Sequence, residues 1–310
     1  MAAVCSAEKG AEDKVQNSVS INKAKKKPIT VGDIVVTAVL TVVALMIFLP
    51  FYNSIIISFE SPQAYALHPV SLYPVDFSLK NYSYLFEKGQ LATGYRNTLF
   101  ITGVGCVYGM MVSVMMAYAF SRKQFPGKKV LFMLMMLTMF FNGGMIPTYL
   151  QLKQMKLIDS LWGVILPLGV STYNIIVLKS GFEQTPPELE EAAKIDGAND
   201  LVIFFRIMLP LQGALLATFS LFTAVAYWNE WFWSMLLINS GSKMTLQTVL
   251  RAIICEATVD ADINSGDVTD LFSQGVKMAA VVLTMVPIMC VYPFLQKYFV
   301  KGVMIGAVKM

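Results

Sequence analysis

Charged side chains are scarce in this sequence. Aspartate, glutamate, lysine and arginine make up 14% of its 310 residues, against about 25% in an ordinary soluble domain. Apolar residues make up 56%, and the mean hydropathy is +0.59. These proportions exclude a typical water-soluble globular protein, so the positions of the few charges become the main guide to the fold.

Residues that hold metals or act in catalysis are also rare. The chain has a single histidine, His68, and four cysteines. One histidine excludes a bis-histidine haem, and no cluster has the ligand spacing of a zinc or di-iron site. The sequence has neither a G-x-S-x-G nucleophile elbow nor a G-x-x-x-x-G-K-[ST] phosphate loop. We therefore expect no catalytic residue, no metal and no cofactor bound by this chain.

Runs without a charged residue occur six times, and each is 19 residues or longer. A helix of about 20 apolar residues crosses a hydrocarbon core about 30 Å thick. Helices are preferred because they satisfy their own backbone polar groups in lipid. The sequence thus predicts an all-α polytopic membrane protein with six transmembrane helices, at about 34–59, 97–121, 130–152, 160–178, 207–233 and 272–296.

The basic residues predict the orientation of these spans. If the N-terminus is inside, 16 of the 24 lysines and arginines face the cytoplasm, as the positive-inside rule requires. Both tails, 1–33 and 297–310, are then cytoplasmic, and the long segments 60–95 and 239–270 are outside. The net charge of +4 is explained by this topology, so nucleic-acid binding is not needed to account for it.

Three glycines in the second span are spaced like part of a dinucleotide-binding motif. Gly103, Gly105 and Gly109 follow no strand pattern, and close packing between helices is the better interpretation.

The cytoplasmic segment 182–206 has the signals of a helix, a turn and a second helix. Thr185 is a candidate N-cap, with Glu188 three residues later to complete a capping box. Gly197 can adopt a positive φ and end the first helix, after which Asn199 can cap a helix that continues to Pro210.

This first helix has the chemistry of a docking element. Ala192 and Ala193 are small enough for a partner backbone to approach closely. Glu190, Glu191 and Asp196 offer carboxylates to partner lysines or arginines. The alternative is an amphipathic linker helix in solvent, because alanine and glutamate are good helix formers in any context.

Several motifs resemble those of one known family. They are Glu191-Ala192-Ala193, Asp196-Gly197-Ala198, Ile207-Met208-Leu209-Pro210, Asn97-Thr98-Leu99-Phe100, Ala117-Tyr118-Ala119-Phe120-Ser121-Arg122, Trp228-Asn229-Glu230 and Tyr298-Phe299-Val300-Lys301-Gly302-Val303. The first three look like the EAA loop of bacterial ABC importer permeases. Together they resemble the maltose-permease type of the carbohydrate uptake transporter-1 family over about residues 30 to 310, and in particular permeases for complex oligosaccharides of the lipoprotein-like or aldouronate type.

The resemblance implies a type I ABC importer permease fold and a complete importer in the bacterial cell membrane. Its other parts would be a second related permease, two ATPase subunits that bind ATP and Mg, and an extracellular substrate-binding protein that delivers an oligosaccharide. The cytoplasmic coupling helices would dock on one ATPase through the residues Glu190, Glu191, Ala192, Ala193, Asp196 and Gly197. The missing phosphate loop fits this scheme, since ATP would be hydrolysed by other chains.

Polar residues at membrane depth are candidates for lining a substrate pathway. They are Asn142, Tyr173, Asn174, Asn229 and Glu230. The alternative for each of them is a hydrogen bond between helices.

Two other functions stay open. A stand-alone secondary transporter or channel often has intramembrane charges or paired repeats, and neither is apparent in spans 1 to 5. An ABC permease for a non-sugar solute is the second alternative. The outer segment 239–270 is longer than the maltose-type pattern, which makes maltose an unsafe guide to the substrate.

Overall fold

The protein is described by a computed structural model in which residues 30–68, 71–87, 89–122, 126–263 and 274–290 are placed. The expected C-terminal tail 297–310, most of the N-terminal tail and part of the outer segment 239–270 lie outside these residues. The chain divides into two units, residues 1–51 and 52–310. The regular secondary structure of the described residues is helical, apart from one isolated antiparallel bridge between Glu60 and Phe77.

The first unit consists of the larger part of α2 (Val31–Ser58). This helix has 28 residues and is therefore about 42 Å long, enough to cross a bilayer. Its apolar side chains between Val31 and Phe51 are all exposed, on every side of the helix. A helix that is apolar all round is typical of a membrane span.

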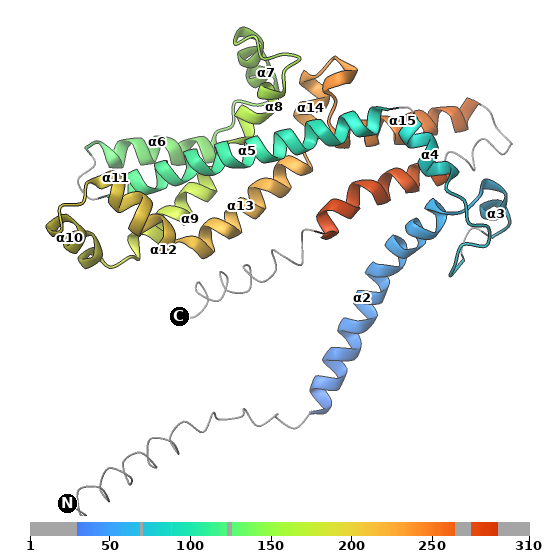
Figure 1. The fold of residues 1–310 in the computed structure, drawn as a ribbon, viewed down its shortest axis with the longest axis horizontal. Coiled ribbons are helices and arrows are strands. Elements are labelled where there is room, and N and C mark those ends of the chain that lie inside the picture. Colours follow the sequence, from blue (N-terminus) through green and yellow to red (C-terminus); the bar gives the residue numbers. More distant parts are fainter. Residues whose placement is uncertain (1–29, 69–70, 88, 123–125, 264–273, 291–310) are drawn as a thin grey trace, which may run out of the picture. The chain divides into compact units, whose positions relative to one another are not determined.

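The second unit is organised around one long helix (Figure 1). Its helices are α3 (Pro62–Leu67), α4 (Lys80–Glu87), α5 (Gln90–Ser121), α6 (Lys128–Phe140), α7 (Met145–Gln154), α8 (Leu161–Leu168), α9 (Thr172–Glu183), α10 (Pro187–Ile195), α11 (Asp200–Ile203), the π-helical turn η1 (Phe204–Met208), α12 (Leu209–Leu211), α13 (Gly213–Trp228), α14 (Phe232–Leu237), the 3-10 turn η2 (Gly241–Lys243) and α15 (Leu246–Ile263). A further helix covers Gln274–Cys290. The central element is α5, which packs against α8, α9, α13 and α15.

Glycines allow other segments to approach α5 closely. A Cβ atom added at Gly105 would lie 2.6–2.8 Å from the ring of Tyr227, and one at Gly109 would lie 3.0 Å from the carbonyl oxygen of Gly169. The prediction of close packing is therefore confirmed at these two positions. At Gly103 an added Cβ would meet nothing within 4 Å in this chain, so close packing there stays a prediction.

The third predicted span is not one continuous helix. Its two halves, α6 and α7, meet at an angle of 117°. The break follows from Asn142 and two glycines: the Asn142 side-chain oxygen accepts a hydrogen bond from the backbone N–H of Gly144 (2.9 Å), and Gly144 has φ +87°. A positive φ favours glycine, and Gly144 with this φ is the N-cap from which α7 starts in a new direction.

The fourth and fifth predicted spans are also bent pairs. The angle is 48° between α8 and α9, and 80° between the segment Asp200–Leu211 and α13. Among the described residues, two continuous helices, α2 and α5, are long and apolar enough to cross a membrane, or up to five if each bent pair counts as one span. The helix Gln274–Cys290 covers the described part of the sixth predicted span, 274–290. The number of six crossings therefore stays a prediction.

An apolar cluster lies where the cytoplasmic ends of several helices are expected. It joins α5, α9 and the segment 193–208 through buried side chains that include Val114, Ala117, Phe120, Ile175, Leu178, Phe182, Ala193, Ile203, Phe204 and Met208. This cluster positions the candidate site, because one residue of α10 belongs to it.

Candidate functional site

The predicted helix, turn and helix are present in the segment 182–206. The turn after α10 has Gly197 at φ +82°, and the side-chain oxygen of Asn199 accepts a hydrogen bond from the N–H of Val202 (2.8 Å), which caps α11. The second helix continues through η1 to Leu211. The predictions for Gly197 and Asn199 are confirmed.

The predicted N-cap of the first helix is wrong. The N-cap of α10 is Pro186, and no side chain caps the helix there. The Thr185 hydroxyl instead accepts a hydrogen bond from the amide nitrogen of Gln212 (3.0 Å), which also donates to the carbonyl oxygen of Gly181 (3.0 Å). The side chain of Gln212 thus ties the start of α10 to α13, and the capping box with Glu188 does not form.

The six residues predicted for coupling fall on two faces. Glu190 and Ala193 face their own chain: Ala193 is 7% exposed in the apolar cluster, and Glu190 forms ion pairs with Arg122 and with Lys194 (3.0 Å). The other four are exposed, namely Glu191, Ala192, Asp196 and Gly197. Glu190 and Ala193 therefore do not offer a free carboxylate and a free small side chain to a partner, because contacts within the chain occupy both.

A group of apolar side chains that the sequence analysis missed extends the exposed face. Ile195 is 86% exposed, Leu201 68%, Phe205 59% and Leu189 43%. A signal for them exists in the sequence, because Leu189 and Ile195 interrupt an otherwise polar or alanine-rich helix. Exposed large apolar residues beside carboxylates are typical of a protein interface.

Several ion pairs surround the inner face of this segment. The Arg122 guanidinium, at the end of α5, pairs with Glu190 and lies over the ring of Tyr118 (4.2 Å to its centre). Nearby, Lys179 and Lys128 both reach Glu183, at 2.7 and 3.6 Å. These pairs connect the ends of α5, α6, α9 and α10.

Four of the five candidate pathway residues make hydrogen bonds within the chain. Asn174 of α9 donates to the Thr223 hydroxyl of α13 (3.4 Å), which is a bond between helices as the alternative predicted. The other three bonds are local. Besides Asn142 at the α6–α7 break, Asn229 donates to the carbonyl oxygen of Val225 (3.0 Å), and Glu230 accepts a bond from the N–H of Trp233 (2.5 Å) at the start of α14.

The fifth candidate, Tyr173, lies on α9 and is 57% exposed. Its ring stacks edge-on against Phe219 of α13, with 6.2 Å between the ring centres. The structure does not bring the five residues together into one polar site.

The segments predicted to lie outside are held to α5 by hydrogen bonds. Asn97 donates to the carbonyl oxygens of Ser242 and Met244 (3.0 and 2.9 Å), and the Thr98 hydroxyl accepts the N–H of Leu246 (2.8 Å). This gives a physical reason for the Asn97-Thr98 motif, since both side chains are buried in this contact.

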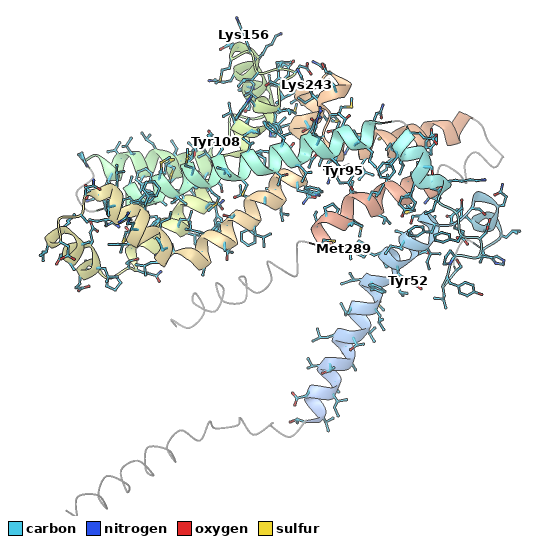
Figure 2. The ribbon with its side chains drawn as sticks, in the orientation of Figure 1. Tyr52, Tyr95, Tyr108, Lys156, Lys243 and Met289 are labelled. Carbon is cyan, nitrogen blue, oxygen red and sulfur yellow. The ribbon has the colours of Figure 1, made fainter. Side chains whose placement is uncertain are left out.

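A second contact joins two of the loops that are predicted to lie outside. Asp159 precedes α8 and has φ +53°. Its carboxylate accepts hydrogen bonds from Ser240 and from Lys243. Lys243 is labelled in Figure 2. These hydrogen bonds hold the pKa of the Asp159 carboxyl well below its usual range.

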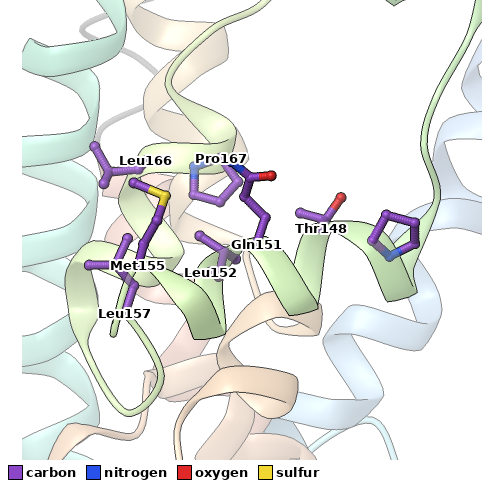
Figure 3. Close-up of a pocket in the computed structure, with 8 residues that line it drawn as sticks. Thr148, Gln151, Leu152, Met155, Leu157, Leu166 and Pro167 are labelled. Carbon is purple, nitrogen blue, oxygen red and sulfur yellow. The ribbon is translucent and has the colours of Figure 1, made fainter.

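A pocket of about 420 Å³ lies between α7 and α8 (Figure 3). Its lining is mainly apolar, with Leu152, Met155 and Leu166 among others, and its polar side chains are those of Thr148 and Gln151. A sugar needs several converging hydrogen-bond groups, so this pocket does not have the character of a saccharide site.

The described residues hold no group of three or more His, Cys, Asp or Glu side chains that could bind a metal.

Comparison with known proteins identifies the fold. Residues 95–305 match the family described as the binding-protein-dependent transport system inner membrane component. The chain belongs to this family.

Relatives and a solved structure agree with this assignment. The chain is 39% identical to the polygalacturonan/rhamnogalacturonan transport system permease protein YtcP of Bacillus subtilis (strain 168), over 89% of this chain and 98% of the relative. It is 40% identical to protein LplC of the same strain, over 84% of this chain and 89% of the relative. A bacterial ABC transporter involved in the import of the acidic polysaccharide alginate contains a chain with 32% identity and a TM-score of 0.79, over 88% of this chain and 98% of that chain.

The predicted fold class and the family resemblance are thereby confirmed. This member of the family is an all-α membrane protein with the type I ABC importer permease fold, and it serves as a permease subunit in carbohydrate import.

Proposed function

We propose that this permease forms half of the translocation pathway of an importer for oligosaccharides that contain uronic acids. The main support is the agreement between two independent comparisons. One similar permease is named for polygalacturonan and rhamnogalacturonan, and the similar solved transporter imports alginate. The polymers in both names are acidic polysaccharides.

The importer would contain four further subunits: a second permease that completes the pathway, two ATPases that bind ATP and Mg, and a substrate-binding protein on the outer side. Binding of ATP would favour one arrangement of the ATPase pair, and a docked helix would couple that arrangement to the permease. In this scheme the present chain binds no nucleotide.

The docking surface on this chain would be the exposed face of α10 and α11. Glu191 and Asp196 supply carboxylates there, Ala192 allows close approach, and Ile195 is an exposed apolar side chain. An apolar anchor with a charged rim is the usual composition of a stable protein interface. Glu190 and Ala193 would support this face from behind, and Gly197 would fix the turn that follows the helix.

The topology would place this docking surface in the cytoplasm, with both termini on the same side. The lysines and arginines of the short loop around Arg122 and Lys128 and of the segment 179–206 support this orientation. The contacts of Asn97 and Asp159 would then hold the outer loops that receive the binding protein.

Co-purification and uptake together test the proposal. The chain is expressed with its second permease and ATPases, purified, and reconstituted in vesicles that contain ATP or ADP. We expect the ATPases to co-purify, and we expect vesicles with ATP to accumulate oligogalacturonides from a polygalacturonan digest when the binding protein is present. Vesicles with ADP are the control for ATP dependence, and maltotriose is the neutral control for the substrate class.

Two results would overturn parts of the proposal. Uptake by the chain alone, driven by an ion gradient, would support a secondary transporter. ATP-driven uptake of maltotriose in preference to oligogalacturonides would overturn the acidic substrate class but not the importer.

A further inference from the structure

The helix α10 is attached to the rest of the chain by few contacts. None of the other labelled helices packs extensively against it. Besides the chain on either side of it, two of its side chains contact other described elements directly. Ala193 is buried in the apolar cluster, and Glu190 pairs with Arg122 at the end of α5. A direct route from α10 to α5 therefore runs through these two side chains.

Arg122 is held in a fixed position for this contact. Its guanidinium lies over the ring of Tyr118, and its Nε donates to the Ser121 hydroxyl (3.3 Å). The Tyr118 ring in turn packs against Phe182 and Phe204, with 5.6 and 4.7 Å between ring centres. An arginine fixed in this way loses little side-chain entropy when it pairs with a carboxylate.

The ion pair is also partly shielded from solvent. The side chains of Arg122 and Glu190 are 24% and 18% exposed. Ion pairs that are partly buried are screened less by salt and water than exposed ones. The pair can therefore resist a displacement of one helix relative to the other.

The other end of α5 contacts the outer segments. Asn97 and Thr98 bind residues 242–246 by hydrogen bonds. From Thr98 to Arg122 the helix is about 36 Å long. A single rigid helix thus has the outer loops at one end and the ion pair with α10 at the other.

We propose that the Arg122–Glu190 ion pair is the positioning link that transmits movement of α10 to α5, and through α5 to the outer loops. This inference rests on the proposed docking of α10 on an ATPase. Coupling between distant sites requires an element that moves as a unit and whose position both sites affect. The helix α5, fixed at both ends, has the form of such an element.

Lys194 offers a matched control. Its Nζ lies 3.0 Å from the other carboxylate oxygen of Glu190, but it belongs to α10 itself, one turn further along. Loss of Lys194 removes a positive charge beside the same carboxylate without removing a connection between helices. If Glu190 only needs a neutralising charge, loss of Lys194 should have the same effect as loss of Arg122. If the link between helices matters, only loss of Arg122 should have an effect.

The experiment uses the whole importer reconstituted in lipid vesicles with its second permease, ATPases and binding protein. Four forms of this chain are compared with the natural one: Arg122→Glu, Glu190→Arg, the double exchange Arg122→Glu/Glu190→Arg, and Lys194→Ala. The readouts are the stimulation of ATP hydrolysis by the binding protein in the presence of oligogalacturonides, and the amount of ATPase retained on purification.

We expect each single reversal to lower the stimulation by about fivefold or more, at the lower end of typical coupling between sites, while the ATPase is retained. The double exchange should recover at least half of the stimulation, and Lys194→Ala should leave it nearly unchanged. Recovery in the double exchange also excludes a simple folding defect of the single reversals.

Full stimulation in both single reversals would overturn the inference, as would an equal loss in Lys194→Ala. Failure of the double exchange to recover stimulation while the ATPase is retained would overturn it too. A natural complex without ATP-dependent uptake would instead contradict the proposed function, so the two failures are distinguishable.

Discussion

The Nζ atom of Lys243 lies 3.0 Å from a carboxylate oxygen of Asp159, 84 residues away in the chain. The same carboxylate accepts bonds from the N–H and the hydroxyl of Ser240 (2.9 and 2.6 Å). The loop before α8 and the segment around η2 are therefore fixed to each other at one residue. The function proposed here places this contact on the side of the membrane that receives the binding protein.

Asp159→Asn should release the segment around η2. The asparagine cannot form an ion pair with Lys243, which keeps its bond to the backbone carbonyl oxygen of Asp159 (2.5 Å). The NH₂ group of the asparagine also cannot accept the bonds that the second carboxylate oxygen accepts. A nitroxide label at Ser242→Cys, in a background without other cysteines, should become more mobile in this variant at pH 7. Asp76→Asn, which changes an exposed carboxylate elsewhere, is the control and should not alter the label.

The pH dependence of this contact follows from the lowered pKa of Asp159. The pKa of an aspartate in the unfolded chain is about 3.9. When the folded-state pKa is lower, the carboxyl stabilises the fold fully at any pH above the unfolded-state pKa. This contribution is lost as the pH falls through the folded-state pKa. The label should therefore stay immobile in the natural protein from pH 7 down to about pH 4. Mobility that rises between pH 6 and pH 5 would contradict the assignment.

Gly105→Val should destabilise the packing of α5 against α13. An added Cβ would lie within 2.8 Å of the Tyr227 ring, whose hydroxyl is held by a bond to the carbonyl oxygen of Ile165 (2.7 Å). Because this ring cannot move freely, overpacking should cost about 1–3 kcal/mol. Gly103→Val is the matched control, since open space surrounds that position. Equal thermal midpoints for the two variants in detergent would contradict this interpretation.

Local signals in the sequence predicted the turn of the candidate site correctly, and long-range contacts explain the errors. The φ of Gly197 and the cap by Asn199 depend on neighbouring residues, so the sequence around them contains the needed information. The hydroxyl of Thr185 binds Gln212, 27 residues away, and this contact displaces the predicted cap. Glu190 pairs with Arg122, which is 68 residues away. Because local sequence does not reveal this pair, the sequence alone predicts that Glu190 faces a partner.

The broken third span shows a different limit. A search for runs without charge treats glycine like any uncharged residue, although Gly143 and Gly144 next to Asn142 were visible signals of a break. The angle of 117° between α6 and α7 could not be derived from these residues alone, because packing against other helices determines it.

Ile195→Glu should weaken the association with the ATPase without unfolding the permease. The side chain is 86% exposed, so its replacement should change the free energy of unfolding by no more than about 0.5 kcal/mol. A charge placed in an apolar contact should lower the affinity for the ATPase by about tenfold or more, as for a single anchoring residue. Leu67→Glu, at a residue 76% exposed in another segment, is the control, and co-purification of the ATPase measures both. Equal retention in both variants would exclude Ile195 from the interface.

Gly197→Pro should lower ATP-driven uptake while the protein remains folded. Gly197 has φ +82°, and proline is restricted to φ near −65°, so the turn between α10 and α11 must change direction. Gly197→Ala retains the turn at a cost of roughly 1–2 kcal/mol and should lower uptake less. Gly241→Ala, at a glycine without positive φ and with open space around it, is the control. Normal uptake by the proline variant would show that the direction of this turn does not affect coupling.

Tyr173 remains a candidate for contact with the transported sugar, because it is 57% exposed and α9 and α13 hold its ring against Phe219. An aromatic ring can pack on a sugar face for about 1 kcal/mol, and its loss corresponds to about fivefold in affinity. Tyr173→Ala should therefore raise the substrate concentration at half-maximal uptake about fivefold. Tyr173→Phe keeps the ring, so its half-saturation should stay close to that of the natural protein. Asn229→Ala is the comparison, since Asn229 binds its own helix at Val225 and should have a smaller effect. If the maximal rate falls with no change in half-saturation, Tyr173 acts through its packing against Phe219, and the interpretation as a pathway residue is wrong.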